Sequence, residues 1–291
     1  MTAPPEAPVS AVMDAPAAAP RRGQWRRGLA TPSARIGLAA VGLMYLAGLA
    51  APLLTGHDPE AQSAHALLGP GGGHLLGTDE YGRDLWARVL YGIRVDVLVT
   101  VVAVPIGAVL GTALGVLCGA HRWVDLVLQR AFDVMLAFTA LILGVTVAAI
   151  IGPGLPAVLI TVAGVNVPLF GRIARDAVMT QRDLDYVVAA RTVGVGPVRL
   201  LLRHILPNGV DALVVQAALS LSLAVFVEGA MSFVGIGVRA PAPSLGSLLR
   251  SSVNFLHQNP AYAIGPMIAV TLLVVAFNLV ADGLGKGLLK R

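Results

Sequence analysis

Long apolar runs alternate with shorter polar segments along the chain. The first run, residues 36–54, holds 19 residues and no charge. A helix rises 1.5 Å per residue, so roughly 20 apolar residues cross the hydrocarbon core of a bilayer. The pattern predicts an all-α membrane protein with both termini on one side. We expect about six transmembrane helices, at residues 36–54, 97–118, 134–151, 155–170, 212–234 and 261–280.

Composition excludes an ordinary soluble domain. Of the 291 residues, 56% are hydrophobic and only 13% are charged, far from the balance of a globular protein in water. The single cysteine, Cys118, lies inside an apolar run. Because the chain has only one cysteine, it can form neither an intrachain disulfide nor a metal site built from cysteines.

The basic residues are distributed unevenly about the predicted membrane. A net charge of +5 could indicate a nucleic-acid partner. With the termini inside, however, 16 of the 21 Lys and Arg residues fall on inner segments and five on outer ones. This positive-inside distribution predicts a protein of the cytoplasmic membrane with cytoplasmic termini and no nucleic-acid partner.

The polar segments divide the chain into parts. The first 34 residues are rich in Ala and Pro and poor in bulky apolar side chains, so they predict a disordered cytoplasmic tail. A short polar turn is expected at 121–133. The remaining parts are a first transmembrane helix with an extracytoplasmic loop (35–96), a core transmembrane domain (97–282) that includes a cytoplasmic loop (171–208), and a cytoplasmic C-terminal tail (283–291).

The cytoplasmic segment 185–208 has the character of a docking surface. Gly194 ends a first helical piece, because glycine frees the backbone, and Pro207 ends a second. The small side chains of Ala189 and Ala190 let another surface approach closely, and basic residues surround them. This chemistry is typical of a helix held in a partner's groove.

The same segment resembles the cytoplasmic loop of the membrane subunits of ATP-driven, binding-protein-dependent importers. The pattern of that loop is Glu-Ala-Ala, three residues, Gly, nine residues, Ile, one residue, Leu-Pro. Val188 replaces the Glu and His204 replaces the Ile, and the ending His-x-Leu-Pro-Asn resembles the dipeptide, oligopeptide and nickel branch. The resemblance implies a coupling helix gripped by ATPase subunits. The residues it assigns to this contact are Tyr186, Val188, Ala189, Ala190, Gly194, His204, Leu206 and Pro207.

Two further stretches resemble the same branch. Residues 74–84 contain Leu-Gly-Thr-Asp-x-x-Gly-Arg-Asp, the signature that precedes the second helix, and we expect Thr78 and Asp84 to cap helices there. The run around Glu228 resembles Glu-x-x-Leu-Ser-Phe-Leu-Gly-x-Gly. Residues 241–246 resemble Pro-x-Pro-x-Trp-Gly, with Leu245 in place of Trp, in an outer loop that would face a binding protein.

Together the resemblances imply a permease subunit with the type I ABC importer fold. Its expected partners are a homologous permease, two ABC ATPase subunits, an extracytoplasmic substrate-binding protein and membrane lipid. Half of the path for di- or oligopeptides would lie in this chain, with nickel and other small solutes as alternatives. Residues 283–287, Gly-Leu-Gly-Lys-Gly, lack the frame of a nucleotide-binding loop. The chain is thus not expected to be an enzyme or to hold a cofactor, and ATP and Mg²⁺ would bind the ATPase subunits.

Three groups of residues allow two interpretations each. Glu228, an acid inside an apolar run, lies beside the substrate path or has a structural partner. A glycine strip packs against another helix or lines the path. The histidines at 57, 65 and 74 are metal ligands or ordinary exposed residues, and their spacings of 8 and 9 match no compact metal motif, so no metal site is predicted. The strip consists of Gly107, Gly111, Gly115 and Gly119.

Two other classes of membrane protein fit the sequence less well. A secondary transporter would have an inverted repeat and paired ionisable residues at the midplane, and the sequence shows neither. An intramembrane hydrolase would need a nucleophile with a partner at equal depth, or a zinc-binding helix. No predicted span contains a histidine.

Overall fold

The computed structural model describes residues 28–71, 73–120, 122–182, 184, 187, 192, 196, 200 and 206–288. Within this part of the chain, five helices are long and apolar enough to cross a membrane, and a bent helix pair forms a sixth candidate. The regular elements are helical throughout. They are α2 (Pro32–Leu49), α3 (Ala51–Leu54), α4 (Leu85–Ala120), α5 (Arg122–Ala137), α6 (Ala140–Ile151), α7 (Leu155–Gln181), α10 (Leu206–Val234), α11 (Leu245–Ser252), a short 3-10 helix (Val253–Phe255) and α12 (Ala261–Leu288).

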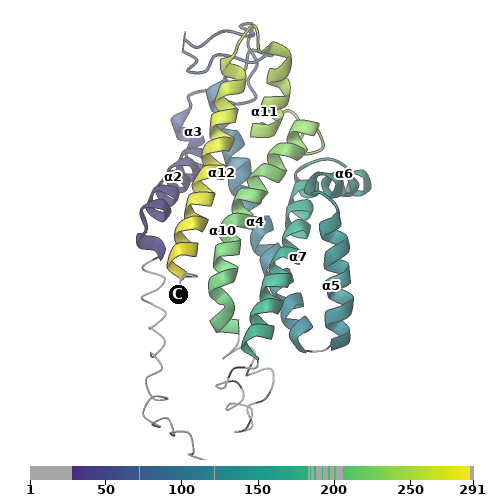
Figure 1. Ribbon diagram of the computed structural model, residues 1–291. Coiled ribbons are helices and arrows are strands. Elements are labelled where there is room, and N and C mark those ends of the chain that lie inside the picture. The colour runs from purple at the N-terminus through teal and green to yellow at the C-terminus, as the bar shows by residue number, and fades with distance from the viewer. Residues whose placement is uncertain are drawn as a thin grey trace, which may run out of the picture.

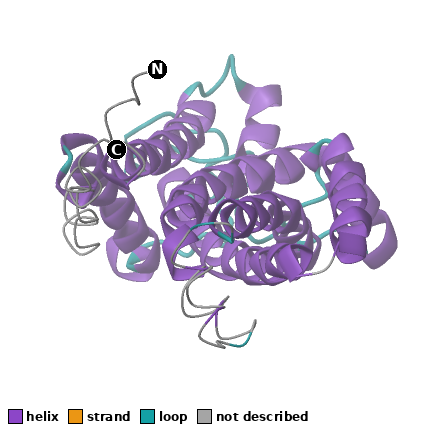
Figure 2. Ribbon diagram, turned by 60° about the horizontal axis from the view of Figure 1, so that its bottom comes forward, coloured by secondary structure: helices purple, strands orange, loops and turns teal. Residues whose placement is uncertain are grey.

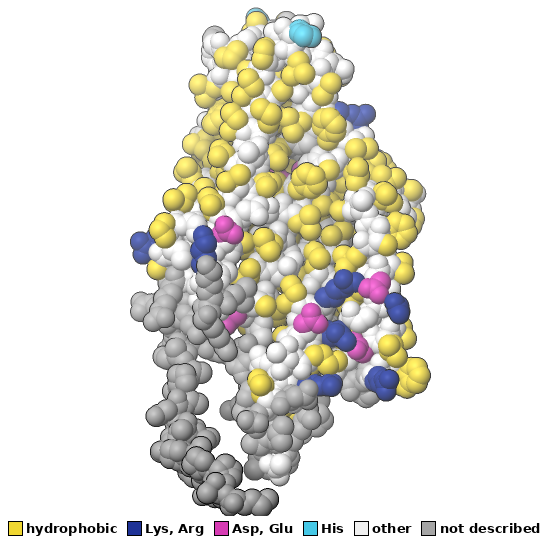
Figure 3. All heavy atoms as spheres, in the orientation of Figure 1, with side chains coloured by type: hydrophobic (Ala, Val, Ile, Leu, Met, Phe, Trp, Pro, Cys, Tyr) yellow, Lys and Arg dark blue, Asp and Glu magenta, His cyan; other side chains and the backbone are white. Residues whose placement is uncertain are grey.

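The long helices run side by side and form one bundle (Figures 1 and 2). Helix α4 packs most extensively on α7, while α12 packs on both α2 and α10. We call the end that carries residues 55–84 and α11 the upper end, as in Figure 1. The lower end is the one where α7 ends and α10 begins. On the face drawn in Figure 3, apolar side chains cover the middle of the bundle, and charged side chains gather toward the lower end.

Helix α4 begins twelve residues before the predicted start of its span. The side chain of Asp84 accepts a hydrogen bond from the Ala87 amide at 2.7 Å, so the predicted helix cap at Asp84 is confirmed. The predicted cap at Thr78 is wrong. Thr78 starts no helix, and its hydroxyl instead donates to the His65 carbonyl at 2.6 Å and accepts from the Leu68 amide at 2.9 Å. These bonds fold the loop back on itself.

The predicted turn at 121–133 is wrong, because helix α5 starts at Arg122. A bend of 95° then separates α5 from α6, and the Thr139 side chain caps α6 by accepting from the Ile142 amide at 3.3 Å. Two of the polar residues that suggested a turn, Asp125 and Asp133, pair with arginines of α7. Asp125 accepts from Nη2 of Arg175 at 2.7 Å, and these ion pairs hold α5 along its neighbour.

Three other helix ends differ from the predicted ones. Helix α10 begins at Leu206, so Pro207 lies in its first turn, where a missing amide donor costs nothing. The prediction that Pro207 ends a preceding helix is therefore wrong. Helix α12 continues to Leu288 and enters the predicted tail, and α2 begins at Pro32. Helix α7 runs through Arg172 and Arg175 to Gln181.

Candidate functional site

The predicted coupling segment begins and ends at the lower end of the bundle. Helix α7 ends at Gln181 and α10 starts at Leu206, and Figure 1 shows both ends close together. Leu206 and Pro207 therefore open α10 at this end. The other residues assigned to the ATPase contact lie outside the described residues: Tyr186, Val188, Ala189, Ala190, Gly194 and His204.

Two described residues of this segment are anchored in the bundle. Val187 is fully buried and Leu200 is 3% exposed. Both pack with Val178 near the end of α7, and Val116 of α4 joins the same apolar cluster. Because burial of each such side chain contributes roughly 1.5–3 kcal/mol, the cluster ties the segment to α7 and α4. Sequence reasoning assigned neither residue, although both fall at apolar positions between the motif residues.

The glycine strip of α4 lies directly against α7. A Cβ added at Gly115 would lie 2.1 Å from the Gly171 carbonyl oxygen, and one at Gly111 would lie 2.3 Å from that of Val167. At Gly107 and Gly119 the corresponding closest distances, to α7 atoms, are 2.6 and 2.3 Å. Gly107, Gly111 and Gly115 thus permit a backbone-to-backbone approach that no larger residue allows, while Gly119 makes room for the Val178 side chain. The contact joins α4 to α7 over most of its length.

Glu228 of α10 is 1% exposed and faces Asp96 of α4, which is fully buried. One carboxylate oxygen of Glu228 accepts a hydrogen bond from the Ser232 hydroxyl at 2.8 Å. The hydroxyl also accepts from the Val238 amide at 3.1 Å, which links the pair to the loop after α10. Sequence reasoning missed Asp96 because it precedes the predicted span by one residue. A charged residue that close to an apolar run was the available signal.

The Leu-Gly-Thr-Asp motif forms a buried charge network at the upper end. Asp79 is fully buried; it accepts from Nε of Arg83 at 2.6 Å and from the backbone amides of Tyr81 and Arg83 at 2.9 Å. Nε of Arg88 lies 3.5 Å from the same carboxylate, and its Nη1 donates to the Pro59 carbonyl at 2.8 Å. Asp79 and Arg83 thus form an ion pair, and the network fixes the loop to the start of α4.

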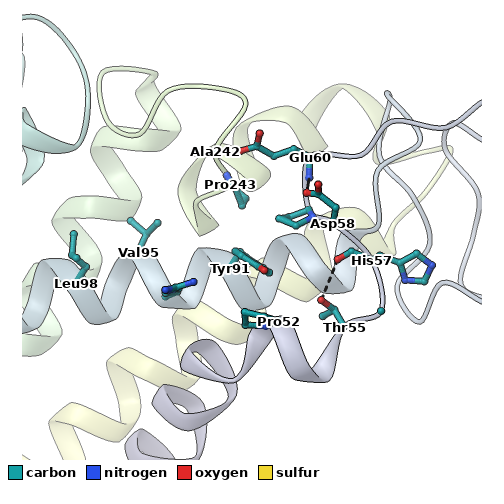
Figure 4. A pocket seen from close by; sticks show the side chains of 13 residues that line it. Pro52, Thr55, His57, Asp58, Glu60, Tyr91, Val95, Leu98, Ala242 and Pro243 are labelled. Atoms are coloured by element: carbon teal, nitrogen blue, oxygen red, sulfur yellow. Dashed lines mark hydrogen bonds between the residues drawn. The ribbon is translucent and has the colours of Figure 1, made fainter.

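A cavity of 680 Å³ lies beside this network (Figure 4). Tyr91 and Val95 of α4 form its floor, and Pro243 comes from the loop before α11. The segment after α3 contributes His57 and Asp58. The cavity is thus built where three separate segments of the chain meet at the upper end.

The chain is similar in sequence to several transport permeases. A dipeptide transport system permease protein of Alkalihalophilus pseudofirmus is 38% identical over 251 residues, which cover 86% of this chain and 83% of the relative. A di/tripeptide transport system permease protein of Pseudomonas aeruginosa is 38% identical over 256 residues, which cover 85% and 84%. A glutathione transport system permease protein of Pectobacterium atrosepticum is 36% identical, and the match covers 74% and 72%.

The fold is also shared with a solved structure. A chain of the MetNI methionine ABC transporter in an inward-facing conformation superposes with a TM-score of 0.60 at 19% identity, covering 71% of this chain and 98% of the other. The family model described as binding-protein-dependent transport system inner membrane component matches residues 111–291. With these relatives and this helical bundle, the chain belongs to the family of binding-protein-dependent transport system inner membrane components.

Proposed function

We propose that this chain is the permease subunit of an ATP-driven importer and forms half of the path for di- or oligopeptides. The observation that carries the proposal is the similarity, over more than four fifths of both chains, to permeases whose names specify dipeptide and di/tripeptide transport. The bundle supports it, because its elements are membrane-length helices. Nickel or another small solute is the alternative cargo within the same family, and a secondary transporter is the alternative outside it.

The chain works with separate subunits under this proposal. ATP and Mg²⁺ bind two ABC ATPase subunits, since the sequence has no loop that could cradle the phosphates, and no cofactor binds this chain. A homologous permease completes the path, and a binding protein delivers the solute. The lower end is cytoplasmic, as the basic residues there indicate, and both termini lie on that side. The upper end, with its charge network and cavity, faces the binding protein.

Coupling follows from the anchored segment. When the ATPase subunits close, they would move the predicted coupling helix around Ala190 as a rigid body. Val187 and Leu200 are buried against α7 and α4, so this movement reaches the helices that the glycine strip locks together. A closely packed pair of helices moves as one unit rather than bending. The path would then switch between its inward-open and outward-open forms.

Glu228 has a structural role under this proposal and does not line the path. It is almost fully buried within a single chain, accepts a hydrogen bond from Ser232 and lies against Asp96. A residue that lines a path between two permeases would instead be exposed on the chain's own surface. The carboxyl group therefore joins α10 to α4 near the upper end.

Purification from the native host tests the assembly. The protein is extracted in mild detergent with an affinity tag, and all co-purifying proteins are identified by mass spectrometry. ATPase subunits and a second permease are expected. Ala190→Asp adds bulk and charge to the docking face and should lose the ATPase subunits while inserting normally, whereas the exposed Asp58→Ala at the upper end should retain them. Recovery of this chain alone, active in transport without ATP, would favour a secondary transporter.

A further inference from the structure

The upper end brings together three metal-ligating side chains that are far apart in the sequence. They are His57 after α3, His74 in the loop and Asp84 at the start of α4, and one ligand atom from each lies within 4.8 Å of the other two. The imidazole rings of His57 and His74 have centroids 5.0 Å apart. The sequence spacings of 8 and 9 concern the histidines alone, whereas folding places the carboxylate of Asp84 beside two of them.

We propose that His57, His74 and Asp84 form a binding site for a divalent first-row transition metal ion, with Zn²⁺ as the representative ion. Two imidazoles and one carboxylate are one of the ligand sets that hold Zn²⁺ in three-ligand sites, where a water molecule or a further ligand takes the fourth position. Ca²⁺ and Mg²⁺ favour oxygen ligands only, so they fit this set poorly.

The geometry needs little change to accept the ion. Nδ1 of His74 lies 2.7 Å from Oδ2 of Asp84. Ligand bonds of about 2.0–2.1 Å at tetrahedral angles separate neighbouring ligand atoms by about 3.3 Å. The ion would take the place of the proton between His74 and Asp84, and these two groups would separate by a fraction of an ångström. His57 is exposed on the segment after α3 and completes the set by a small shift.

Two of the three ligands are fixed by the fold before any ion binds. Asp84 is 4% exposed, and its other carboxylate oxygen caps α4 through the Ala87 amide. His74 is held in its loop by reciprocal backbone bonds with Gly71, both 2.9 Å long. Such support from surrounding hydrogen bonds keeps ligands in place and strengthens metal binding.

The bound ion would join the segment after α3 to the start of α4. His57 and Asp58 also belong to the lining of the 680 Å³ cavity. In Figure 4 the His57 ring points away from Tyr91 and Val95, toward the outer loop. The ion would therefore bind at the rim of the cavity and outside its interior. It would fix the position of the segment that carries His57. This inference is independent of the transported solute.

Metal binding to the full-length protein tests the inference. The protein is purified without a histidine tag, together with any subunits that accompany it, placed in lipid nanodiscs and stripped with a chelator. Zn²⁺ is then titrated against a competing coloured chelator, and bound metal is measured by mass spectrometry. We expect one bound Zn²⁺ per chain in the original protein. Variants at His57, His74 and Asp84 should bind less Zn²⁺ or none. Co²⁺ in place of Zn²⁺ should give the visible absorption of a low-coordinate nitrogen and oxygen site.

Matched variants separate this site from adventitious binding. His57→Asn and His74→Asn should each lower the affinity by at least about tenfold, the loss seen even when groups that only support ligands are removed. Asp84→Asn should do the same while preserving the helix cap, because Asn caps as well as Asp. His65→Asn, in the same loop, should leave binding unchanged. Equal binding by all four variants, or no stoichiometric binding by the original protein, would overturn the proposal and leave an ordinary His74–Asp84 hydrogen bond.

Discussion

The carboxyl groups of Asp96 in α4 and Glu228 in α10 contact each other in the interior of the bundle. Both oxygens of Asp96 and one oxygen of Glu228 are buried without a hydrogen-bond donor. Two carboxyl groups offer each other only acceptor oxygens unless a proton lies between them. The two helices thus meet at a carboxyl pair in which three oxygen atoms lack a hydrogen-bond donor. A substitution that introduces a donor at position 96 can satisfy one of them.

Asp96→Asn should stabilise the protein. The new amide group can donate to the unsatisfied oxygen of Glu228, and it removes one of two like groups. A satisfied buried acceptor is worth about 1–3 kcal/mol, so we expect a higher melting temperature in lipid nanodiscs. Asp176→Asn is the control, because that side chain is 71% exposed and should change little. A lower melting temperature for Asp96→Asn would show that the carboxyl at 96 is itself required.

Gly115→Val should separate α4 from α7. Even a Cβ at this position would lie 2.1 Å from the Gly171 carbonyl oxygen, and backbone cannot move aside as a flexible side chain can. We expect a loss of at least about 1–3 kcal/mol in stability, as for other overpacked sites, and a lower yield of folded protein by size-exclusion chromatography. A Cβ added at Gly42 would have no neighbouring atom within 4 Å, so Gly42→Val should be tolerated. Equal tolerance of both variants would contradict the close contact.

Asp79→Ala should disrupt the upper end. Arg83 and Arg88 are buried around this carboxylate, with side-chain exposures of 8% and 5%. Removal of their shared counter-ion leaves two buried charges, at a cost of about 3–5 kcal/mol. Faster proteolysis in the loop 55–84 and a lower melting temperature are the measured effects. Asp58→Ala, at an exposed position of the same loop, should behave like the original protein, and the same behaviour by Asp79→Ala would argue against the network.

Val187→Asp should uncouple ATP hydrolysis from the bundle. The substitution places a carboxylate in the apolar cluster with Val178 and Leu200, where a charge has no partner. In the reconstituted complex we expect solute-stimulated ATPase activity to fall to the basal rate. Val187→Ile keeps an apolar side chain there and should retain most of the stimulation. Full stimulation in the Val187→Asp variant would mean that the anchored segment does not transmit the movement.

The positions of the five long helices could be predicted from the sequence because a membrane-spanning helix is specified by a long apolar run. Their ends could not. Arg88 and Asp96 were assigned to a loop because of their charge, yet both are buried in α4, where Arg88 pairs with Asp79 of the preceding loop and Asp96 lies against Glu228 of α10. Helix α5 was missed for the same reason, since its polar residues pair with α7.

The candidate sites divide in the same way. Motifs that are continuous in sequence, such as the Leu-Gly-Thr-Asp run, pointed to residues that the structure places in a single network. Groups assembled from separate segments had no local signal. His57 meets His74 and Asp84 only because the loop folds back over the start of α4, and Val187 and Leu200 pack in one cluster with Val116 of α4, which is far from them in the sequence.

ATP-driven peptide uptake is the most direct test of the proposed transport function. The complex that co-purifies with this chain is reconstituted into proteoliposomes with its binding protein, and entry of a radiolabelled dipeptide and a longer peptide is followed with and without ATP. We expect peptide accumulation that requires ATP, is competed by unlabelled peptide and is lost in the Ala190→Asp variant. Uptake that proceeds equally without ATP would contradict ATP-driven import. Transport of nickel or another solute with no peptide uptake would contradict peptides as the transported solute.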